Sequence, residues 1–163
     1  MLSLIKRYYR SFCRALAFAR IGWSNYDWDN GYLDQLVLFK LKRMQYEFLN
    51  HGYHWEGCKN YKPKMKSLAL TIKLLEKLVK DDYTRFYNLH EKKWGARTYV
   101  FKKLELSNYS TMETTVALAD TPEKVEQERK EFLEASSADD RQRVRDLELA
   151  YRLIGKYSHY WWD

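Results

Sequence analysis

The chain has 163 residues, of which 45% are hydrophobic and 31% are charged, and its formal net charge is +7. This length corresponds to one domain, and the composition excludes wholesale disorder and any need for disulfide bonds. Six glycines and two prolines are too few for the turns of a many-stranded β-sandwich. We therefore expect a single, mostly α-helical domain over residues 1–163. It would be a compact bundle of about five helices with at most a minor β element near residues 97–101.

The positive charge is concentrated in the first part of the chain. Residues 1–103 contain 21 Lys and Arg against 9 Asp and Glu, a net charge of +12. Residues 104–163 contain 8 against 13, a net charge of −5. This asymmetry indicates either an anionic partner for the basic half or docking of the two halves on each other. Two solvated faces of one helical domain would give the same counts.

The first predicted helix, residues 4–20, is amphipathic and contains no acidic residue. Helical spacing places five apolar residues on one face, namely Ile5, Tyr9, Phe12, Leu16 and Ala19. The opposite face carries the cations Lys6, Arg7, Arg10 and Arg14. These cations interrupt the apolar stretch of a signal peptide, and no apolar run reaches the roughly 18 residues of a spanning helix. We expect no membrane span, and a membrane-surface role for this helix is a minor alternative.

Two further helices are predicted over residues 29–49 and 63–89, each with a stripe of apolar side chains. One charged residue interrupts each stripe, Lys40 in the first and Asp82 in the second. Three interpretations stay open for these residues. They form a buried ion pair, they line a ligand pocket, or they are simply exposed at a helix end.

The last third of the chain is predicted to hold a short strand and two acidic helices. The strand covers residues 97–101, and no partner strand is evident from the sequence. Thr121 followed by Pro122 is typical of a helix start, and that helix is expected to reach Glu134. The segment 137–140 resembles a capping box, which would begin a separate last helix that ends near the terminal tryptophans.

The sequence offers little support for catalysis, so we predict that the protein is not an enzyme and has no cofactor. It contains no glycine-rich phosphate loop, G-x-S-x-G elbow or H-E-x-x-H helix. His51, His54 and Cys58 have metal-like spacing, but they make one half of a site that usually has two. We interpret them as part of a polar loop and keep them as a weak metal candidate. A cluster of three aspartates before and within the second helix is expected to cap that helix rather than bind a cation.

Binding of an anion is better supported, because cations and aromatic rings alternate in the first 66 residues. Cations on three predicted helices form the candidate surface: Lys6, Arg7, Arg10, Arg14, Lys40, Lys42, Arg43, Lys62, Lys64 and Lys66. Trp23, Tyr26 and Trp28 lie in the linker after the first helix. Cations beside exposed rings suit a nucleic acid or a nucleotide ligand, since cations neutralise phosphates and rings stack on bases. The alternative is that the rings fill gaps between helices and the lysines are solvated.

Several short segments of the chain form a recognisable pattern. They are residues 26–29 (Y-D-W-D), residues 39–44 (F-K-L-K-R-M), a leucine-rich helix that ends in D-D-Y at 81–83, and the closing W-W-D at 161–163. This pattern resembles that of a family of small, largely uncharacterised proteins encoded by tailed bacteriophages. It covers about residues 23–90 and the last few residues. The resemblance implies a phage product acting in the cytoplasm of a bacterial host, and it carries over no catalytic residue.

The sequence thus predicts a non-catalytic phage accessory protein that binds an anionic partner through the basic part of residues 1–66. The partner would be a nucleic acid, a nucleotide signal or a host nucleic-acid enzyme, and an inhibitor of a host defence system is one form of this role. The alternative is a protein-interaction module that uses the acidic C-terminal helices, with Trp161 and Trp162 as anchors or folded onto the core. A homo-oligomer is compatible with either hypothesis.

Overall fold

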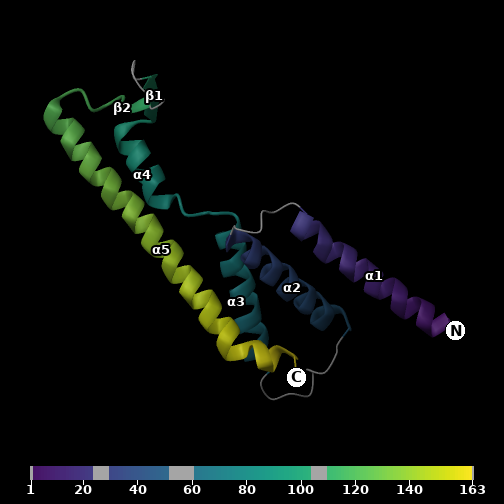
Figure 1. The fold of residues 1–163 in the computed structure, drawn as a ribbon. Helices are drawn as coiled ribbons and strands as arrows, with labels where there is room; N and C mark the ends of the chain where they lie inside the picture. The colour runs from purple at the N-terminus through teal and green to yellow at the C-terminus, as the bar shows by residue number, and fades with distance from the viewer. Residues whose placement is uncertain (1, 24–29, 52–60, 104–109, 163) are drawn as a thin grey trace. The chain divides into compact units, whose positions relative to one another are not determined.

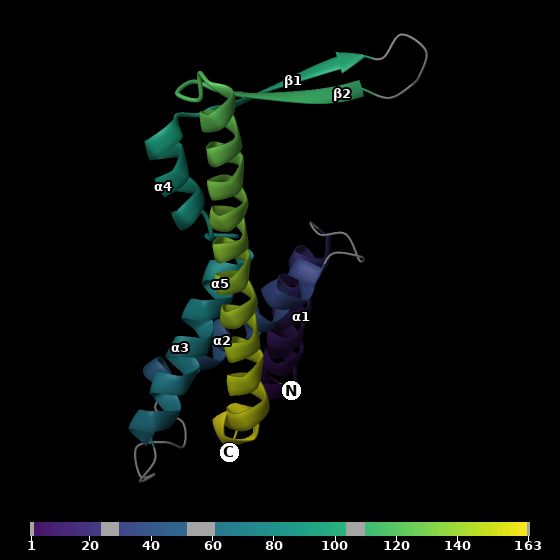
Figure 2. The same cartoon turned by 90° about the vertical axis from the view of Figure 1, so that its left-hand side faces the viewer.

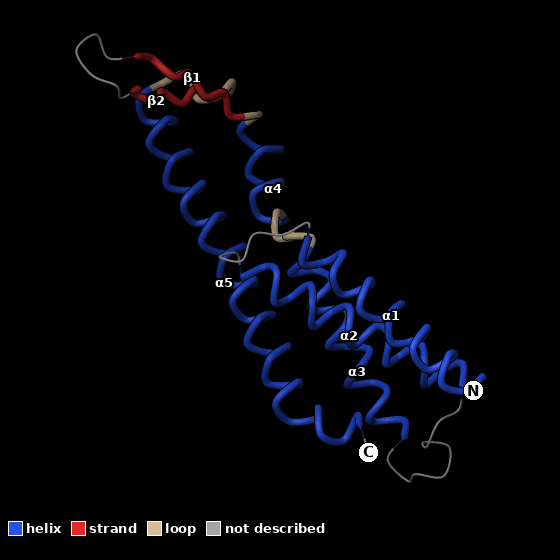
Figure 3. The backbone as a smooth tube through the Cα atoms, turned by 45° about the vertical axis from the view of Figure 1, so that its right-hand side comes forward, coloured by secondary structure: helices blue, strands red, loops and turns tan. Residues whose placement is uncertain are grey.

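The computed structural model describes residues 2–23, 30–51, 61–103 and 110–162. In these residues the chain forms five helices and one two-stranded antiparallel sheet. The elements are α1 (Leu2–Trp23), α2 (Asn30–His51), α3 (Tyr61–Val79), α4 (Arg85–Trp94), β1 (Arg97–Lys103), β2 (Ser110–Val116) and α5 (Pro122–Trp162) (Figure 1). The predicted mostly α fold with a minor β element is confirmed. Figure 3 shows the predominance of helix over strand in the part of the chain that the structure describes.

Contacts within the chain divide it into two units, which we describe separately. Unit 1 comprises residues 1–82 and 146–163, and unit 2 comprises residues 83–145. The helix α5 contributes residues to both units. The single domain expected from the sequence stays a prediction.

Unit 1 has an apolar core built from α2, α3 and the C-terminal segment of α5. The stripes predicted for the second and third helices supply most of its buried side chains. The core residues are Leu38, Leu41, Met44, Leu68, Ile72, Leu75, Leu78, Ala150 and Trp161. Leu68, Leu75 and Trp161 have no exposed surface at all, so α3 is the central helix of this unit, as its pattern of apolar residues predicts.

Polar contacts attach the C-terminal segment of α5 to α3 at both ends. Lys77 Nζ lies 2.9 Å from Asp146 Oδ2, and the indole of Trp161 donates to Ser67 Oγ at 3.2 Å. The Trp161 indole is buried and therefore needs this acceptor. Of the two alternatives that the sequence leaves open for Trp161, an anchor or a side chain folded onto the core, the structure has the second.

The third predicted helix is shorter than expected, and this part of the prediction is wrong. Helix α3 ends at Val79 rather than at Leu89, and a separate helix α4 begins at Arg85. Asp81 has a φ of 51°, in the left-handed region that ends helices and that aspartate tolerates better than most residues. Asp82 is consequently exposed beyond the end of α3, which is the third interpretation offered for it, whereas Lys40 is half-buried in α2.

The predicted strand exists and has a partner that the sequence did not reveal. Strands β1 and β2 pair in antiparallel register from Arg97 opposite Val116 to Lys103 opposite Ser110. Figure 2 shows this hairpin beside the N-terminal end of α5. Almost every position of both strands is exposed, so neither strand has the alternation of buried and exposed residues that identifies a strand in a sequence.

The two acidic helices expected near the C-terminus are one continuous helix, α5. Its start is as predicted, because the Thr121 hydroxyl accepts from the amide of Lys124 at 3.3 Å. The second predicted start, at residues 137–140, lies inside the helix. Asp139 instead accepts hydrogen bonds from the amides of Phe86 at 3.1 Å and Tyr87 at 2.9 Å. A carboxylate on α5 thus caps α4, whose own Thr84 side chain makes no capping bond.

Candidate functional site

The four predicted cations of α1 lie together on one face in the exposed N-terminal part of that helix. Lys6, Arg7, Arg10 and Arg14 are all exposed. They recur at spacings of three and four residues, which places them on one face of a helix. The helix contains a fifth cation, Arg20, and no acidic residue, so its own sequence provides no counterion for this row.

The predicted cations of α2 are more involved in contacts within unit 1. Lys42 Nζ lies 2.6 Å from a carboxylate oxygen of Glu76, and this ion pair lowers the pKa of Glu76 below its usual value. The Arg43 guanidinium lies 5.7 Å from the centre of the Phe39 ring. Lys40 is half-buried. These three residues therefore form a less available set of charges than the row on α1.

Two of the three predicted cations of α3 are available to solvent. Lys62 and Lys66 are exposed, and both lie in the first two turns of the helix. Lys64 is half-buried, with its Nζ 5.7 Å from the centre of the Tyr160 ring. The structure thus places Lys64 against the C-terminal segment of α5.

Only one of the predicted aromatic residues of the linker falls on the described part of the chain. Trp23, the last residue of α1, is 94% exposed. Tyr26 and Trp28 lie outside the described residues, and so does the side chain of Trp162. Trp23 fits the predicted pattern of a ring beside cations, although one ring does not by itself form a stacking platform.

The weak metal candidate also falls largely outside the described residues. His51 is the final residue of α2, its side chain is not described, and neither is any atom of His54 or Cys58. Among the residues that are described, no group of three or more His, Cys, Asp or Glu could hold a metal ion.

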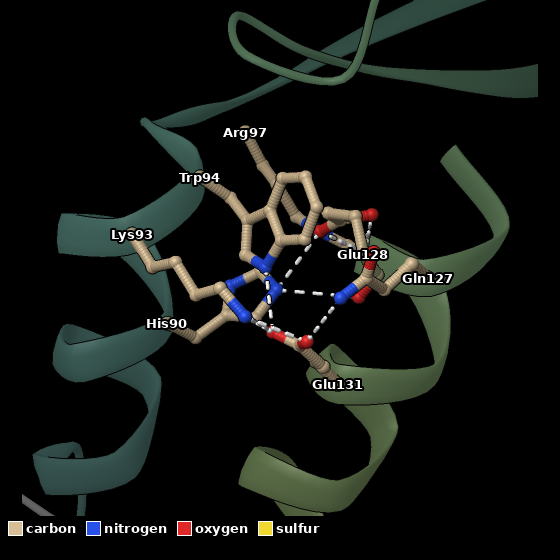
Figure 4. Close-up of polar contacts among 7 residues, drawn as sticks. All are labelled: His90, Lys93, Trp94, Arg97, Gln127, Glu128 and Glu131. Carbon is tan, nitrogen blue, oxygen red and sulfur yellow. Dashed lines mark hydrogen bonds and ion pairs between the residues drawn. The ribbon is translucent and has the colours of Figure 1, made fainter. Parts of the chain in front are cut away.

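A cluster of buried polar residues in unit 2 was not predicted from the sequence (Figure 4). Glu128 accepts two hydrogen bonds from the Arg97 guanidinium, at 2.8 and 2.9 Å, and its Oε1 lies 3.1 Å from His90 Nε2. The side chains of His90 and Glu128 are at most 5% exposed. The Arg97 guanidinium also stacks on Phe132 at 3.4 Å from the ring centre. Because each buried polar side-chain atom has a partner, this cluster is suited to holding α4, β1 and α5 together.

A second carboxylate on the same face of α5 extends this cluster toward solvent. Glu131 accepts from Lys93 Nζ at 2.6 Å, from the Trp94 indole at 2.8 Å and from the Gln127 amide at 3.0 Å (Figure 4). The hydrogen bond from Lys93 is the largest of several effects that lower the pKa of Glu131 to about 2. Glu128 and Glu131 are three residues apart, as expected for neighbours on a helix face.

A pocket of about 470 Å³ lies next to Glu128 in unit 2. It is lined by Arg97, Thr114, Thr115, Val116, Ala119, Val125, Glu128 and Arg129. Arg97 and Glu128 neutralise each other, and every buried side-chain nitrogen or oxygen in the described residues has a hydrogen-bond partner. The pocket therefore offers a ligand no buried polar group in need of a partner.

The sequence contains one signal for the cluster of His90, Arg97 and Glu128, which we call the Glu128 cluster. Residues on two distant segments recur at similar spacings. His90, Trp94 and Arg97 recur every three or four residues, as do Glu128 and Glu131. Hydrogen-bonding side chains on one segment and carboxylates on the other are compatible with pairing, but the sequence alone does not say that these segments are neighbours.

Comparison with known proteins adds no relative. Neither protein-family models nor curated proteins nor solved structures include a match to this chain. In the described residues, moreover, no helix has the length and apolarity required to cross a lipid bilayer.

Proposed function

We propose that this chain is a non-catalytic phage accessory protein that binds an anionic partner through cations of residues 1–66. The observation that carries the proposal is the row on α1. Lys6, Arg7, Arg10 and Arg14 are exposed on a helix that contains no acidic residue. At 1.5 Å per residue the row is about 12 Å long, which spans several phosphates of a nucleic acid strand. A nucleotide signal or the acidic surface of a host nucleic-acid enzyme would present similar chemistry.

The cations of α2 and α3 are expected to contribute unequally to binding. Lys62 and Lys66 are exposed and would add to the electrostatic attraction. Lys42 would have to leave Glu76, which lies 2.6 Å away, and a partner would gain correspondingly less from it. We therefore assign the main role to α1 and a supporting role to the start of α3.

Salt dependence of binding to a defined polyanion tests the proposal. Fluorescein-labelled single-stranded DNA and RNA of mixed sequence are titrated with the full chain at several NaCl concentrations. Binding should weaken steeply as salt rises, because each neutralised phosphate releases a counterion. Replacing Lys6, Arg7, Arg10 and Arg14 by Glu should abolish most binding. If the wild-type contacts are made by these four cations, their loss removes about 3 from the slope of log K against log salt for a single strand.

A matched variant separates a specific surface from net charge. Lys103, Lys130, Arg141 and Arg152 are exposed cations outside residues 1–66, and their replacement by Glu changes the net charge equally. We expect this control variant to retain most of the affinity. Salt-independent binding or equal losses in both variants would overturn the proposal, and absence of binding at low salt would overturn its nucleic-acid form.

A further inference from the structure

The apolar face of α1 is exposed to solvent in unit 1, although its sequence pattern is that of a helix that packs. Six large side chains on this face are each between 54% and 74% exposed: Leu4, Ile5, Tyr8, Tyr9, Phe12 and Leu16. They recur at helical spacing, so they form one continuous stripe, which we call the α1 stripe. An exposed apolar stripe of this length is uncommon on a soluble surface and indicates an interaction site.

Helix α1 contacts α2 near its C-terminal end, whereas the α1 stripe lies earlier in the helix, within residues 4–16. The ring of Phe18 packs edge-to-face on Phe39 at 5.0 Å between ring centres. Near the end of α1, a Cβ on Gly22 would lie 3.2 Å from the Tyr32 hydroxyl, so the two helices approach closely there. Residues 4–16 of α1 are all exposed, and the half-buried residues of this helix come after them, between residues 17 and 22. The contact with α2 therefore leaves the α1 stripe uncovered in the described residues.

The charges beside the α1 stripe indicate what covers it. All five ionic side chains of α1 are cations, and Trp23 at its end is 94% exposed. A helix with an apolar face, a cationic polar face and aromatic residues is typical of helices that lie in the interface of an anionic membrane. Two copies of α1 packed stripe to stripe would bring ten cations together without a counterion. A nucleic acid would use the cations and rings but would give Leu4, Ile5 and Leu16 nothing apolar to contact.

We propose that α1 binds the surface of an anionic lipid bilayer, with the α1 stripe among the upper acyl chains and its cations at the lipid phosphates. This inference goes beyond the function proposed above, because lipid binding also requires the apolar side chains of the α1 stripe. It rests on the proposed function only in using the same cations of α1. Anionic lipid is thus the partner that both faces of α1 fit. No part of the helix needs to cross the bilayer, since an interfacial helix lies parallel to the surface.

Co-sedimentation of the full chain with vesicles tests this inference. One set of vesicles is phosphatidylcholine alone, and the other is phosphatidylcholine with phosphatidylglycerol at about three to one. We expect binding to the anionic vesicles and at least about tenfold weaker binding to the neutral ones. Replacing Ile5, Phe12 and Leu16 by Gln should weaken binding to the anionic vesicles about 100-fold or more, because three buried apolar side chains are lost. Circular dichroism checks that the variant remains helical.

Two controls identify the outcomes that would overturn the inference. Leu89, Leu133 and Val144 are helical side chains that are at least half exposed, and their replacement by Gln should leave vesicle binding unchanged. Undiminished vesicle binding by the α1 stripe variant would contradict the proposal. So would dissociation of a wild-type dimer in that variant, which would assign the stripe to a second copy. An equal loss of oligonucleotide binding would assign it to base stacking.

The same variants keep this inference separate from the function proposed above. The α1 stripe variant retains every cation, so it should still bind single-stranded DNA if the electrostatic proposal holds. Failure of lipid binding with intact, salt-dependent DNA binding overturns only the lipid inference. Binding to anionic vesicles with no binding to either oligonucleotide would overturn the nucleic-acid form of the proposed function and leave the lipid inference standing.

Discussion

The two units of this protein are stabilised by different kinds of interaction. Unit 1 buries mainly apolar side chains along α2, α3 and the end of α5, with Thr71 and Asp146 as buried polar residues beside them. In unit 2 the buried residues include His90, Glu128 and Asp139 together with Tyr83 and Trp94. Apolar burial is non-directional and insensitive to pH, whereas buried charged groups are stable only while their partners are in place. We therefore expect unit 1 to tolerate conservative changes and unit 2 to depend on single polar atoms.

In unit 2, Glu128→Ala is expected to cause the largest loss of stability. The change leaves Arg97 and His90 buried without the carboxylate that both contact, and breaking a buried pair in this way costs about 3–5 kcal/mol. Hydrogen exchange measures the result by region. Amides of α4 should lose most of their protection, while those of α3 keep theirs. Glu126→Ala, at an exposed site on the same helix, is the matched control.

A core substitution in unit 1 tests whether the two units unfold independently. Leu75 is fully buried, and Leu75→Ala should cost about 2–5 kcal/mol because it leaves a cavity in the core. Amide hydrogen exchange should accelerate most in α2 and α3. If either variant exposes both units to the same extent, the units unfold together and the contrast between them does not hold.

A smaller effect is expected from Asp139→Ala. The change removes the acceptor for the amides of Phe86 and Tyr87, which costs about 1–3 kcal/mol for unsatisfied amides at a helix start. Exchange of these two amides should accelerate more than that of any other amide of α4. Asp139→Asn keeps one acceptor oxygen and should lie between the wild type and the alanine variant. A greater cost for Asp140→Ala than for Asp139→Ala would support the capping box that the sequence pattern suggests.

The sequence predicts the helices of unit 1 better than those of unit 2. Apolar periodicity locates α1, α2 and most of α3, because the spacing of core side chains along one helix is a local property. It does not say which face a neighbouring helix covers, and α1 uses Phe18 while leaving Phe12 exposed. The end of α3 depends on the backbone of Asp81, and the charge of Asp82 in the apolar stripe was the only sign of it.

In unit 2 the sequence pattern misleads because the decisive contacts join distant segments. Asp139 caps a helix that begins more than fifty residues earlier in the chain, although its neighbourhood resembles a local cap. The partner of β1 is a stretch of serine and threonine without strand-like alternation. Of the candidate site, the cations of α1 were found from the sequence, whereas the Glu128 cluster depends on a pairing that only the fold defines.

The smallest effect we predict is an acid-dependent loosening around Glu131. Its pKa is lowered to about 2 from an ordinary value of 4.5, chiefly by the hydrogen bond from Lys93. A group with a lowered pKa in the folded state stabilises that state above its unfolded pKa, and the contribution is lost as the pH falls through the folded pKa. The stability difference between wild type and Glu131→Gln should thus be constant above about pH 5 and should vanish between pH 4.5 and 2. Urea unfolding at a series of pH values measures this difference, and Glu134→Gln, an exposed site on the same helix, controls for the loss of one negative charge. A carboxyl chemical shift of Glu131 that titrates near 4.5 would show that the contact with Lys93 is not maintained in solution, and the polar cluster of unit 2 would then end at Glu128.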